Sequence, residues 1–333
     1  MSLPLPLPLS ILDLATVARG ETVAQGLEAS TTLAQRAEQW GFRRIWYAEH
    51  HNMGSIASAA TSVLIAHVAA RTERITLGSG GVMLPNHSPL QVAEQFGTLA
   101  ELHPGRIELG LGRAPGTDQE TVRALRRDPR ASESFPQDVQ ELQAFLGSET
   151  LVPNVNAYPG RGTGVPLTIL GSSLYGAQVA AALGLPYAFA SHFAPDALEQ
   201  AVALYRREFR PSAQLAQPHV LAGVNVIAAD TAEEAQVVLQ ETQRDRVRLL
   251  TGRRGRSLTD AEVDAVLDGP AGDQVRTMTR CSAVGTPDTV VRELGEFRAR
   301  ADADELVVTV PAPRRESWWR SWELLATKVQ GGS

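Results

Sequence analysis

The sequence contains almost no lysine and almost no cysteine, and each absence disfavours particular kinds of site. Of the 31 basic residues among 333, only Lys328 is a lysine, and it lies close to the end of the sequence. Schiff-base enzymes and P-loop kinases need a lysine inside a structured site, so these classes are disfavoured. Cys281 is the one cysteine, which excludes a disulfide framework within the chain and a zinc site made of cysteines alone.

The sequence also lacks a dominant charge and a long hydrophobic run. Its 37 acidic and 31 basic residues give a formal net charge of −6, which argues against a protein that coats nucleic acid or an anionic membrane. The N-terminal segment MSLPLPLPLS carries no positive charge and is broken by prolines, unlike a signal peptide or a membrane span. We therefore expect a cytoplasmic protein without a membrane segment or a nucleic-acid partner.

Short apolar runs alternate with longer amphipathic stretches along most of the chain. The apolar runs predict strands at 7–12, 44–48, 75–79, 106–112, 166–170, 187–190, 220–228 and 305–310. The stretches between them predict helices at 22–40, 55–71, 89–102, 116–127, 136–146, 175–183, 196–209 and from 231 onward, and a Trp-rich helix ends the chain.

Eight strands, nearly all followed by helices, favour a (β/α)₈ TIM barrel over an open parallel sheet, which usually has five or six strands. The segment 251–281 is polar and rich in Arg and Asp, and it breaks the alternation. We interpret it as an insertion before the last βα unit. On this interpretation residues 1–333 form a single barrel domain.

Polar residues and glycines follow the second and third expected strands, at the end of the barrel where active sites lie. Glu49, His50 and His51 follow the second strand, and histidine suits acid–base chemistry near neutral pH. The two histidines could instead be metal ligands or hydrogen-bonded loop residues, but no second ligand cluster is evident and we expect no metal. Gly80 and Gly81 follow the third strand, and glycines let a backbone approach a flat ligand.

The next three strands are followed by residues suited to binding a phosphate or lining a pocket. Arg113 lies among glycines after the fourth strand, and its guanidinium can hold a phosphate with two hydrogen bonds. Ser172 and Ser173 open a helix after the fifth strand and could contribute hydroxyls and amides to a phosphate site, although simple N-capping explains them equally well. His192 follows the sixth strand, and we interpret His87 as a loop residue.

Four segments resemble the bacterial luciferase-like flavin monooxygenases, above all the single-subunit luciferase-like oxidoreductases. Their order and spacing match from about Leu9 to Pro311. The matching segments are Ala-Glu-His-His (48–51), Gly-Ser-Gly-Gly-Val-Met-Leu-Pro (78–85), Pro-Gly-Arg-Ile-Glu-Leu-Gly-Leu-Gly-Arg (104–113) and Leu-Gly-Ser-Ser (170–173).

The resemblance implies a role for each of these residues in a (β/α)₈ barrel. The histidine matching His50 lies beside the flavin and supports its oxygen chemistry, with Glu49 expected to orient it. The pair matching Gly80 and Gly81 lies against the isoalloxazine ring and is commonly joined by a non-proline cis peptide. The residues matching Arg113, Ser172 and Ser173 bind the FMN phosphate. From their positions at strand ends we expect His51 and His192 to line the cofactor pocket.

The resemblance also implies the reactants and partners. These are reduced FMN supplied by a separate flavin reductase, O₂ and a small organic substrate; the family is often dimeric, so a homodimer is an option. Luciferase has a cysteine where Gly112 stands and an acidic residue where Ser172 stands, so light emission is not expected and FMN is favoured. Two alternatives stay open: a dehydrogenase that uses a deazaflavin, and a flavin-binding protein without catalytic activity on the same barrel.

Overall fold

The computed structural model describes residues 8–114, 117–128, 130–251 and 258–329. All strand pairings among them are parallel. The strands are β1 (Leu9–Asp13), β2 (Arg44–Tyr47), β3 (Thr76–Met83), β4 (Ile107–Gly112), β5 (Leu167–Gly171), β6 (Tyr187–Phe189), β7 (Val220–Ala228), β8 (Ser282–Gly285) and β9 (Glu305–Thr309).

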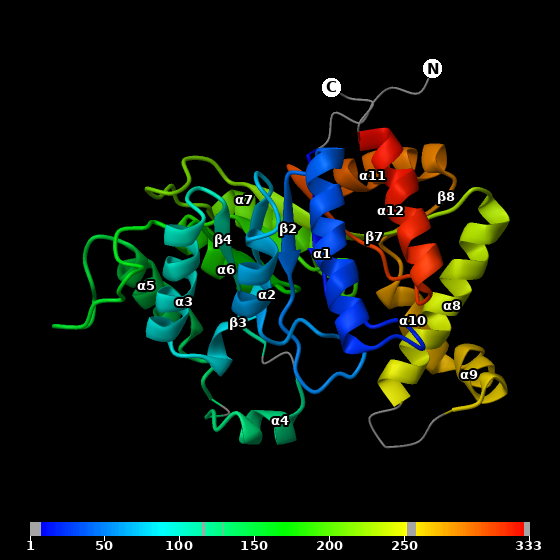
Figure 1. Cartoon of the computed structure of the whole chain (residues 1–333), viewed down its shortest axis with the longest axis horizontal. Helices are drawn as coiled ribbons and strands as arrows, with labels where there is room; N and C mark the ends of the chain where they lie inside the picture. The colour runs from blue at the N-terminus through cyan, green and yellow to red at the C-terminus, as the bar shows by residue number, and fades with distance from the viewer. Residues whose placement is uncertain (1–7, 115–116, 129, 252–257, 330–333) are drawn as a thin grey trace.

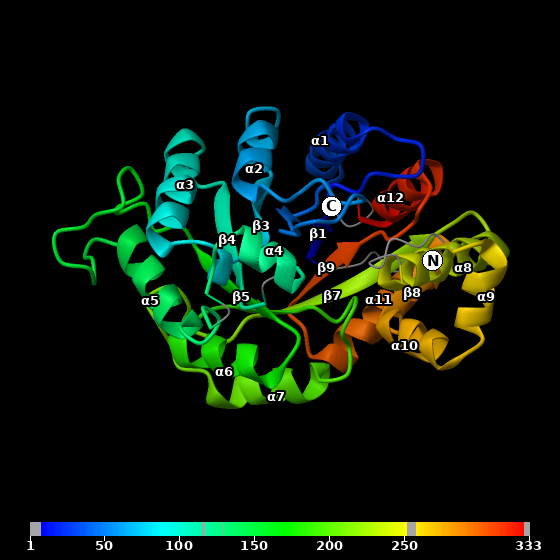
Figure 2. The same ribbon diagram turned by 90° about the horizontal axis from the view of Figure 1, so that it is seen from below.

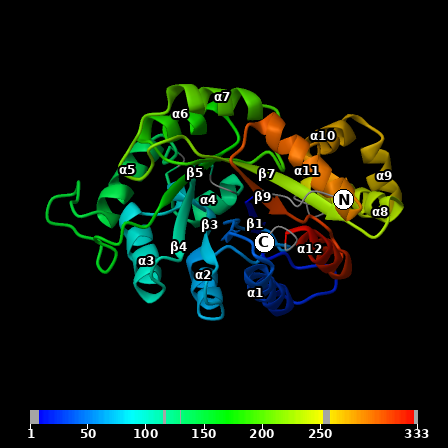
Figure 3. The same cartoon turned by 90° about the horizontal axis from the view of Figure 1, so that it is seen from above.

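The helices surround the strands (Figures 2 and 3). They are α1 (Val23–Trp40), α2 (Thr61–Ala69), α3 (Pro89–Leu102), α4 (Gln119–Ala124), α5 (Phe135–Leu146), α6 (Leu174–Leu183), α7 (Leu198–Glu208), α8 (Ala232–Thr251), α9 (Asp260–Leu267), α10 (Pro270–Met278), α11 (Pro287–Ala301) and α12 (Arg315–Val329), with a 3₁₀ turn, η1 (Leu84–Asn86), after β3. None of the helices in the described residues is long and apolar enough to cross a membrane.

The strand order closes into a ring and confirms the predicted (β/α)₈ barrel. Strands β1 to β6 are neighbours in sequence order, β9 lies between β1 and β7, and the pairing of β6 with β7 closes the ring of eight strands. The remaining strand, β8, pairs only with the second half of β7, along Asn225–Ala228. It therefore extends the sheet outside the ring.

The first helix, which we predicted at 22–40, has strong signals at both ends. Thr22 is its N-cap and forms a capping box with Gln25, and Gly41 ends it in the left-handed conformation, as such residues commonly do. The structure adds β8 and α11, which we did not predict. Strand β8 has the sequence Ser-Ala-Val-Gly, which contains only two apolar residues and therefore no apolar run.

The segment 251–281, interpreted above as an insertion, contains α9 and α10; residues 252–257 of it lie outside the described part. Val263 of α9 and Val275 of α10 pack on Val247 of α8 in a small apolar cluster. Strand β8 and helix α11 then lie between this segment and β9. The segment therefore precedes the unit formed by β8 and α11, and not the last unit, β9 and α12, as we interpreted it.

Side chains that point into the barrel form a polar layer below an apolar layer. At the amino ends of the strands, buried Arg44 donates to Glu108 at 2.7 Å and to Glu305 at 3.2 Å. Above this layer Trp46 is 1% exposed and packs with other inward-facing apolar residues: Leu12, Ala48, Ala188, Leu221 and Val307. Such layers fill the interior of TIM barrels, so the base of this barrel is a packed core.

Glycines on β3 and β4 make room for this core. A Cβ on Gly80 would lie 2.7 Å from Leu12 Cδ1 and 2.8 Å from Trp46 Cβ. A Cβ on Gly110 would lie 2.2 Å from the Ser79 carbonyl oxygen, which is backbone and cannot rotate away. The glycines of these two strands are therefore required by packing, whatever ligand binds above them.

We expect Gly110→Ala to lower the free energy of unfolding by about 1–3 kcal/mol, the usual cost of overpacking a core. The added methyl group would collide with the backbone of β3. Urea unfolding followed by circular dichroism measures the change.

Gly295→Ala is the matched control. Gly295 lies within α11, and a Cβ there would meet nothing within 4 Å, so alanine should raise stability by about 0.5–1 kcal/mol through helix propensity. If Gly110→Ala were as stable as the unaltered protein, the close approach of β3 and β4 would be disproved.

Candidate active site

The predicted site residues that follow β2, β4, β5 and β6 lie at the carboxyl end of the barrel, since every strand of the ring is parallel. Gly80 and Gly81, which we expected after the third strand, lie within the second half of β3, because that strand continues to Met83. Helix α4, which follows β4 at this end, lies at the lower edge of Figure 1. Of the glycine-rich segment expected after β4, Pro115 and Gly116 lie outside the described residues. The other predicted site residues are all described.

Glu49 is the centre of a hydrogen-bonded cluster. Its carboxylate is 1% exposed, and its Oε1 lies 2.7 Å from His51 Nε2 and 2.9 Å from His87 Nε2. The backbone amide of Met83 donates to Oε2 at 3.0 Å. Burial alone would raise the pKa of Glu49, but the bonds from His51 and His87, the charge of His87 and the Met83 amide lower it to about 2. In turn, the bond to Glu49 raises the pKa of His51.

This cluster corrects two expectations. Glu49 does not orient His50, since its hydrogen bonds in the described residues go to His51, His87 and Met83. His87, which we interpreted as a loop residue, belongs to the cluster. The contact joins residues 38 positions apart, so no local pattern could reveal it.

His50 and His192 form a second group, which differs from the Glu49 cluster in that its side chains are uncharged near pH 7. Burial lowers the pKa of His50. Burial, followed by the charges of Arg246 and His50, lowers the pKa of His192 to about 3. The Nδ1 atoms of both residues are buried and have no hydrogen-bond partner within the described residues. Near pH 7 each is therefore a neutral imidazole whose Nδ1 atom is enclosed by the protein.

The backbone of β7 leaves room for the His192 ring. A Cβ on Gly223 would lie 2.3 Å from His192 Nδ1, so any larger residue there would displace the imidazole. Asn225 Nδ2 donates to the His192 carbonyl at 2.7 Å, and the ring of Phe193 lies edge-on at 5.1 Å between centroids. These contacts hold His192 over β7.

The Gly80–Gly81 pair adjoins the Glu49 cluster. Its peptide bond is cis, as the resemblance implies, and the pairing of β3 with β4 shifts register between Ser79 and Val82. The carbonyl of Gly81 accepts a hydrogen bond from the Glu49 amide at 3.2 Å. The irregularity in β3 is therefore tied to the end of β2.

Arg113 and the two serines meet at the beginning of α6. The Arg113 guanidinium carbon lies 4.2 Å from the ring centroid of Tyr175, the second residue of α6. Ser173 is the N-cap residue but its side chain makes no capping bond, and no hydroxyl hydrogen bond of Ser172 or Ser173 occurs within the described residues. The structure thus brings an exposed arginine beside a helix N-terminus whose two hydroxyls are unused.

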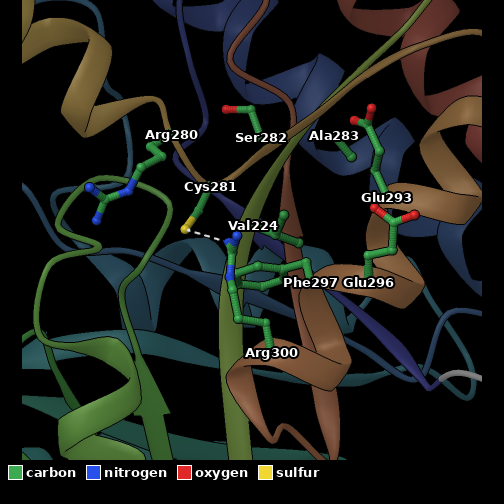
Figure 4. A pocket seen from close by; sticks show the side chains of 9 residues that line it. All are labelled: Val224, Arg280, Cys281, Ser282, Ala283, Glu293, Glu296, Phe297 and Arg300. Carbon is green, nitrogen blue, oxygen red and sulfur yellow. Dashed lines mark hydrogen bonds between the residues drawn. The ribbon is translucent and has the colours of Figure 1, made fainter.

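One cavity adjoins the Glu49 cluster, and a second lies away from the predicted site residues. One of about 240 Å³ lies on the outer side of the Glu49 cluster and is lined by Glu49, His87 and the start of α2. The other, of about 410 Å³, lies against β8 and α11 and is lined by residues such as Cys281, Glu293 and Arg300, which Figure 4 shows. The second cavity contains none of the predicted site residues. Within the described residues no group of His, Cys, Asp and Glu has the arrangement of a metal site.

Comparison with known proteins gives one consistent result. The model of a family described as luciferase-like monooxygenase matches residues 8–304. A protein of Escherichia coli (strain K12) named luciferase-like monooxygenase is 46% identical over 317 residues, covering 95% of each chain. N-acetyl-S-alkylcysteine monooxygenase of Bacillus subtilis (strain 168) is 32% identical, covering 96% of this chain and 98% of its own.

Solved structures share the fold. The crystal structure of apo-MsnO8 has a TM-score of 0.86 and 36% identity, covering 97% of this chain and 98% of its own. Two others are under 25% identical and show the fold alone. They are the FMN complex of the oxygenating constituent of 3,6-diketocamphane monooxygenase from Pseudomonas putida (16%, TM-score 0.70, covering 99% of this chain and 98% of its own) and an F420-dependent secondary alcohol dehydrogenase (15%, TM-score 0.65, covering 97% and 99%).

Replacing Glu49 with Gln should change stability in a pH-dependent way. The pKa of Glu49 is lowered from 4.5 to about 2, so its contribution is present above pH 4.5 and is lost as the pH falls toward 2. The pKa of His51 is raised from 6.5, so its contribution is present below pH 6.5 and is lost as the pH rises through the folded value. We expect the stability difference between the unaltered protein and Glu49→Gln to peak between about pH 4.5 and 6.5, on the order of 3 kcal/mol.

Urea unfolding at about pH 3, 5.5 and 8.5 measures this difference. Glu101→Gln, an exposed position at the end of α3, is the control and should show almost no difference at any of the three pH values. A Glu49→Gln difference that is the same at all three would contradict the charge assignment of the cluster.

Proposed function

The chain belongs to the luciferase-like monooxygenase family, and on that premise we propose that it is a monooxygenase that uses reduced FMN and O₂ on a small organic substrate. The observation that carries the choice of FMN is the group formed by Arg113, Ser172 and Ser173. An exposed guanidinium held beside a helix N-terminus with two unused hydroxyls suits a phosphate dianion. The stacking on Tyr175 keeps the guanidinium at that place.

The flavin ring would lie over the Gly80–Gly81 pair. Gly81 and Gly112 are packed against neighbouring residues, since Cβ atoms there would lie 2.7 Å from the Gly110 carbonyl oxygen and 2.9 Å from Met83 Sδ. This packing fixes the backbone on which the ring would rest. Reduced FMN supplies the electrons that activate O₂, and the protein supplies binding, orientation and protons.

Each part of the site then has a task. Arg113 and the two serines hold the phosphate, and the glycine backbone supports the ring. His50, which is neutral near pH 7, accepts or donates the proton that the reaction moves, and His192 lines the pocket. Glu49 keeps its negative charge, and its bonds to His51 and His87 hold the loops that follow β2 and β3.

We further propose that a separate flavin reductase supplies the reduced FMN. No G-x-G-x-x-G sequence opens a helix after β1, where a dinucleotide fingerprint would lie. A deazaflavin-dependent dehydrogenase is the second candidate function, because the F420-dependent secondary alcohol dehydrogenase has the same fold. The relative named N-acetyl-S-alkylcysteine monooxygenase supports oxygenation over dehydrogenation.

We expect Arg113→Ala to weaken FMN binding roughly 10- to 100-fold, the value of a charge-assisted hydrogen bond. Riboflavin, which lacks the phosphate, should bind the variant and the unaltered protein equally. Quenching of flavin fluorescence in an anaerobic titration measures both affinities.

Arg123→Ala is the matched control, since it removes the same charge from an exposed position on α4. It should leave FMN affinity unchanged. The proposal fails if the unaltered protein shows no saturable binding of FMN or reduced FMN below about 1 mM, or if Arg113→Ala binds FMN as the unaltered protein does. Preference for a deazaflavin over FMN in the same titration would select the second candidate.

A further inference from the structure

The last turns of α8 lie at the carboxyl end of the barrel. Thr242 Oγ1 donates to the carbonyl of Pro311, just after β9, at 3.3 Å. Asp245 forms an ion pair with Arg19, in the segment after β1. In Figure 1 this part of α8 descends toward the same lower side as α4. The helix therefore contributes side chains to the face that carries the site.

Arg246 lies on the inward face of this helix. The buried residues Ala235, Val238 and Thr242 are spaced three and four apart, and Arg246 continues the series at the next fourth position. Residues at this spacing share one face of a helix. Arg246 is half-buried, and burial lowers its pKa.

Arg246 has no acidic partner, whereas the arginines on either side of it do. Arg244 donates to Asp264 at 2.7 Å, and Arg248 donates to Asp245 at 3.1 Å and also binds Asp260. Within the described residues Arg246 makes no hydrogen bond or ion pair. The residues outside that part contain no Asp or Glu, so none of the chain's 37 acidic side chains pairs with it. A half-buried cation without a partner is costly, and functional sites retain such groups.

The neighbours of Arg246 do not neutralise it either. It is close enough to His192 for its charge to lower the pKa of that residue, and His50 acts on His192 in the same way. Both imidazoles are neutral near pH 7 and leave Nδ1 without a partner. Glu49, the carboxylate that follows β2, is already bound by His51 and His87. Within the described part of the chain, this side of the site therefore has one cation and two neutral imidazoles, and no acidic group that is free to pair with the cation.

We propose that Arg246 binds a carboxylate group of the substrate, and that the enzyme acts on small organic acids. This inference rests on the proposed function and names its substrate class. The planar guanidinium matches a carboxylate with two parallel hydrogen bonds, and the bound anion offsets the cost of the unpaired charge. The substrate carboxylate at Arg246 would lie beside His192, which lines the pocket.

The carboxylate site is separate from the phosphate site. Arg113 follows β4 and the serines follow β5, whereas α8 follows β7, and β6 lies between β5 and β7 in the ring. In both views along the barrel, α6 and α8 stand apart (Figures 2 and 3). Two arginines on two sides of the barrel can therefore hold two different anions.

The test compares hexanoate with hexanamide, which has a similar shape but no charge. Each is titrated by calorimetry into the protein, first without flavin and then with FMN present. The unaltered protein should bind hexanoate at least 10-fold more tightly than hexanamide. Arg246→Met should remove this preference and leave the affinity for hexanamide within about twofold. Arg246→Lys should keep only part of the preference, because an ammonium group cannot make the two parallel hydrogen bonds of a planar guanidinium.

Arg244→Met is the control, since Arg244 lies on the same helix and is paired with Asp264; it should keep the preference for hexanoate. If Arg246 had only a structural role, Arg246→Met would unfold at a lower temperature than the unaltered protein. Because the proposed role is ligand binding, we expect Arg246→Met to unfold at the same or a higher temperature. The proposal is overturned if the unaltered protein does not prefer hexanoate, or if Arg246→Met keeps the preference. It is also overturned if Arg246→Met weakens FMN binding as much as Arg113→Ala, which would make Arg246 a flavin ligand. Because the first titration contains no flavin, it tests the preference for hexanoate separately from FMN binding, on which the proposed function depends.

Discussion

The packing of Trp46 in the middle of the barrel is the constraint on which the site depends. This side chain is 1% exposed, and it fits only because Gly78 and Gly80 present no side chain to it. At Gly110, β4 passes so close to Ser79 that no Cβ could be added. The core below thus determines the path of β3, whose register shift brings the Gly81 carbonyl against the amide of Glu49. Core packing and site geometry share the same glycines.

Charge is divided between two groups at this end of the barrel. The Glu49 cluster holds a buried carboxylate with two histidines around it, and its low pKa keeps the negative charge at any ordinary pH. His50 and His192 are buried without such a partner, so desolvation favours their neutral forms. In the function proposed above, neutral His50 would supply the proton donor or acceptor, and the charged Glu49 cluster would be part of the fixed scaffold.

Much of the site could be predicted from the sequence because it follows the strands. In a parallel barrel, whatever comes after a strand reaches the same face, so the positions of Arg113 and His192 followed from the strand pattern alone. The hydrogen bond between Glu49 and His87 could not be predicted in this way, since His87 reaches Glu49 from another loop. That Arg246 has no acidic partner could not be predicted for a similar reason: it is one of several arginines of a polar helix, and only the packed structure shows that the others are paired.

The sequence by itself determined the alternation of strands and helices, and with it the barrel and the face that carries the chemistry, because hydrophobic periodicity and end-of-helix signals are local properties. Only the tertiary structure decided which charged groups are paired and which are unused. Pairing depends on contacts between residues far apart in the chain and on burial, which sets the cost of leaving a charge alone. That distinction separates Arg246 from Arg244 and His50 from His51, although each pair has the same residue type in nearly the same place.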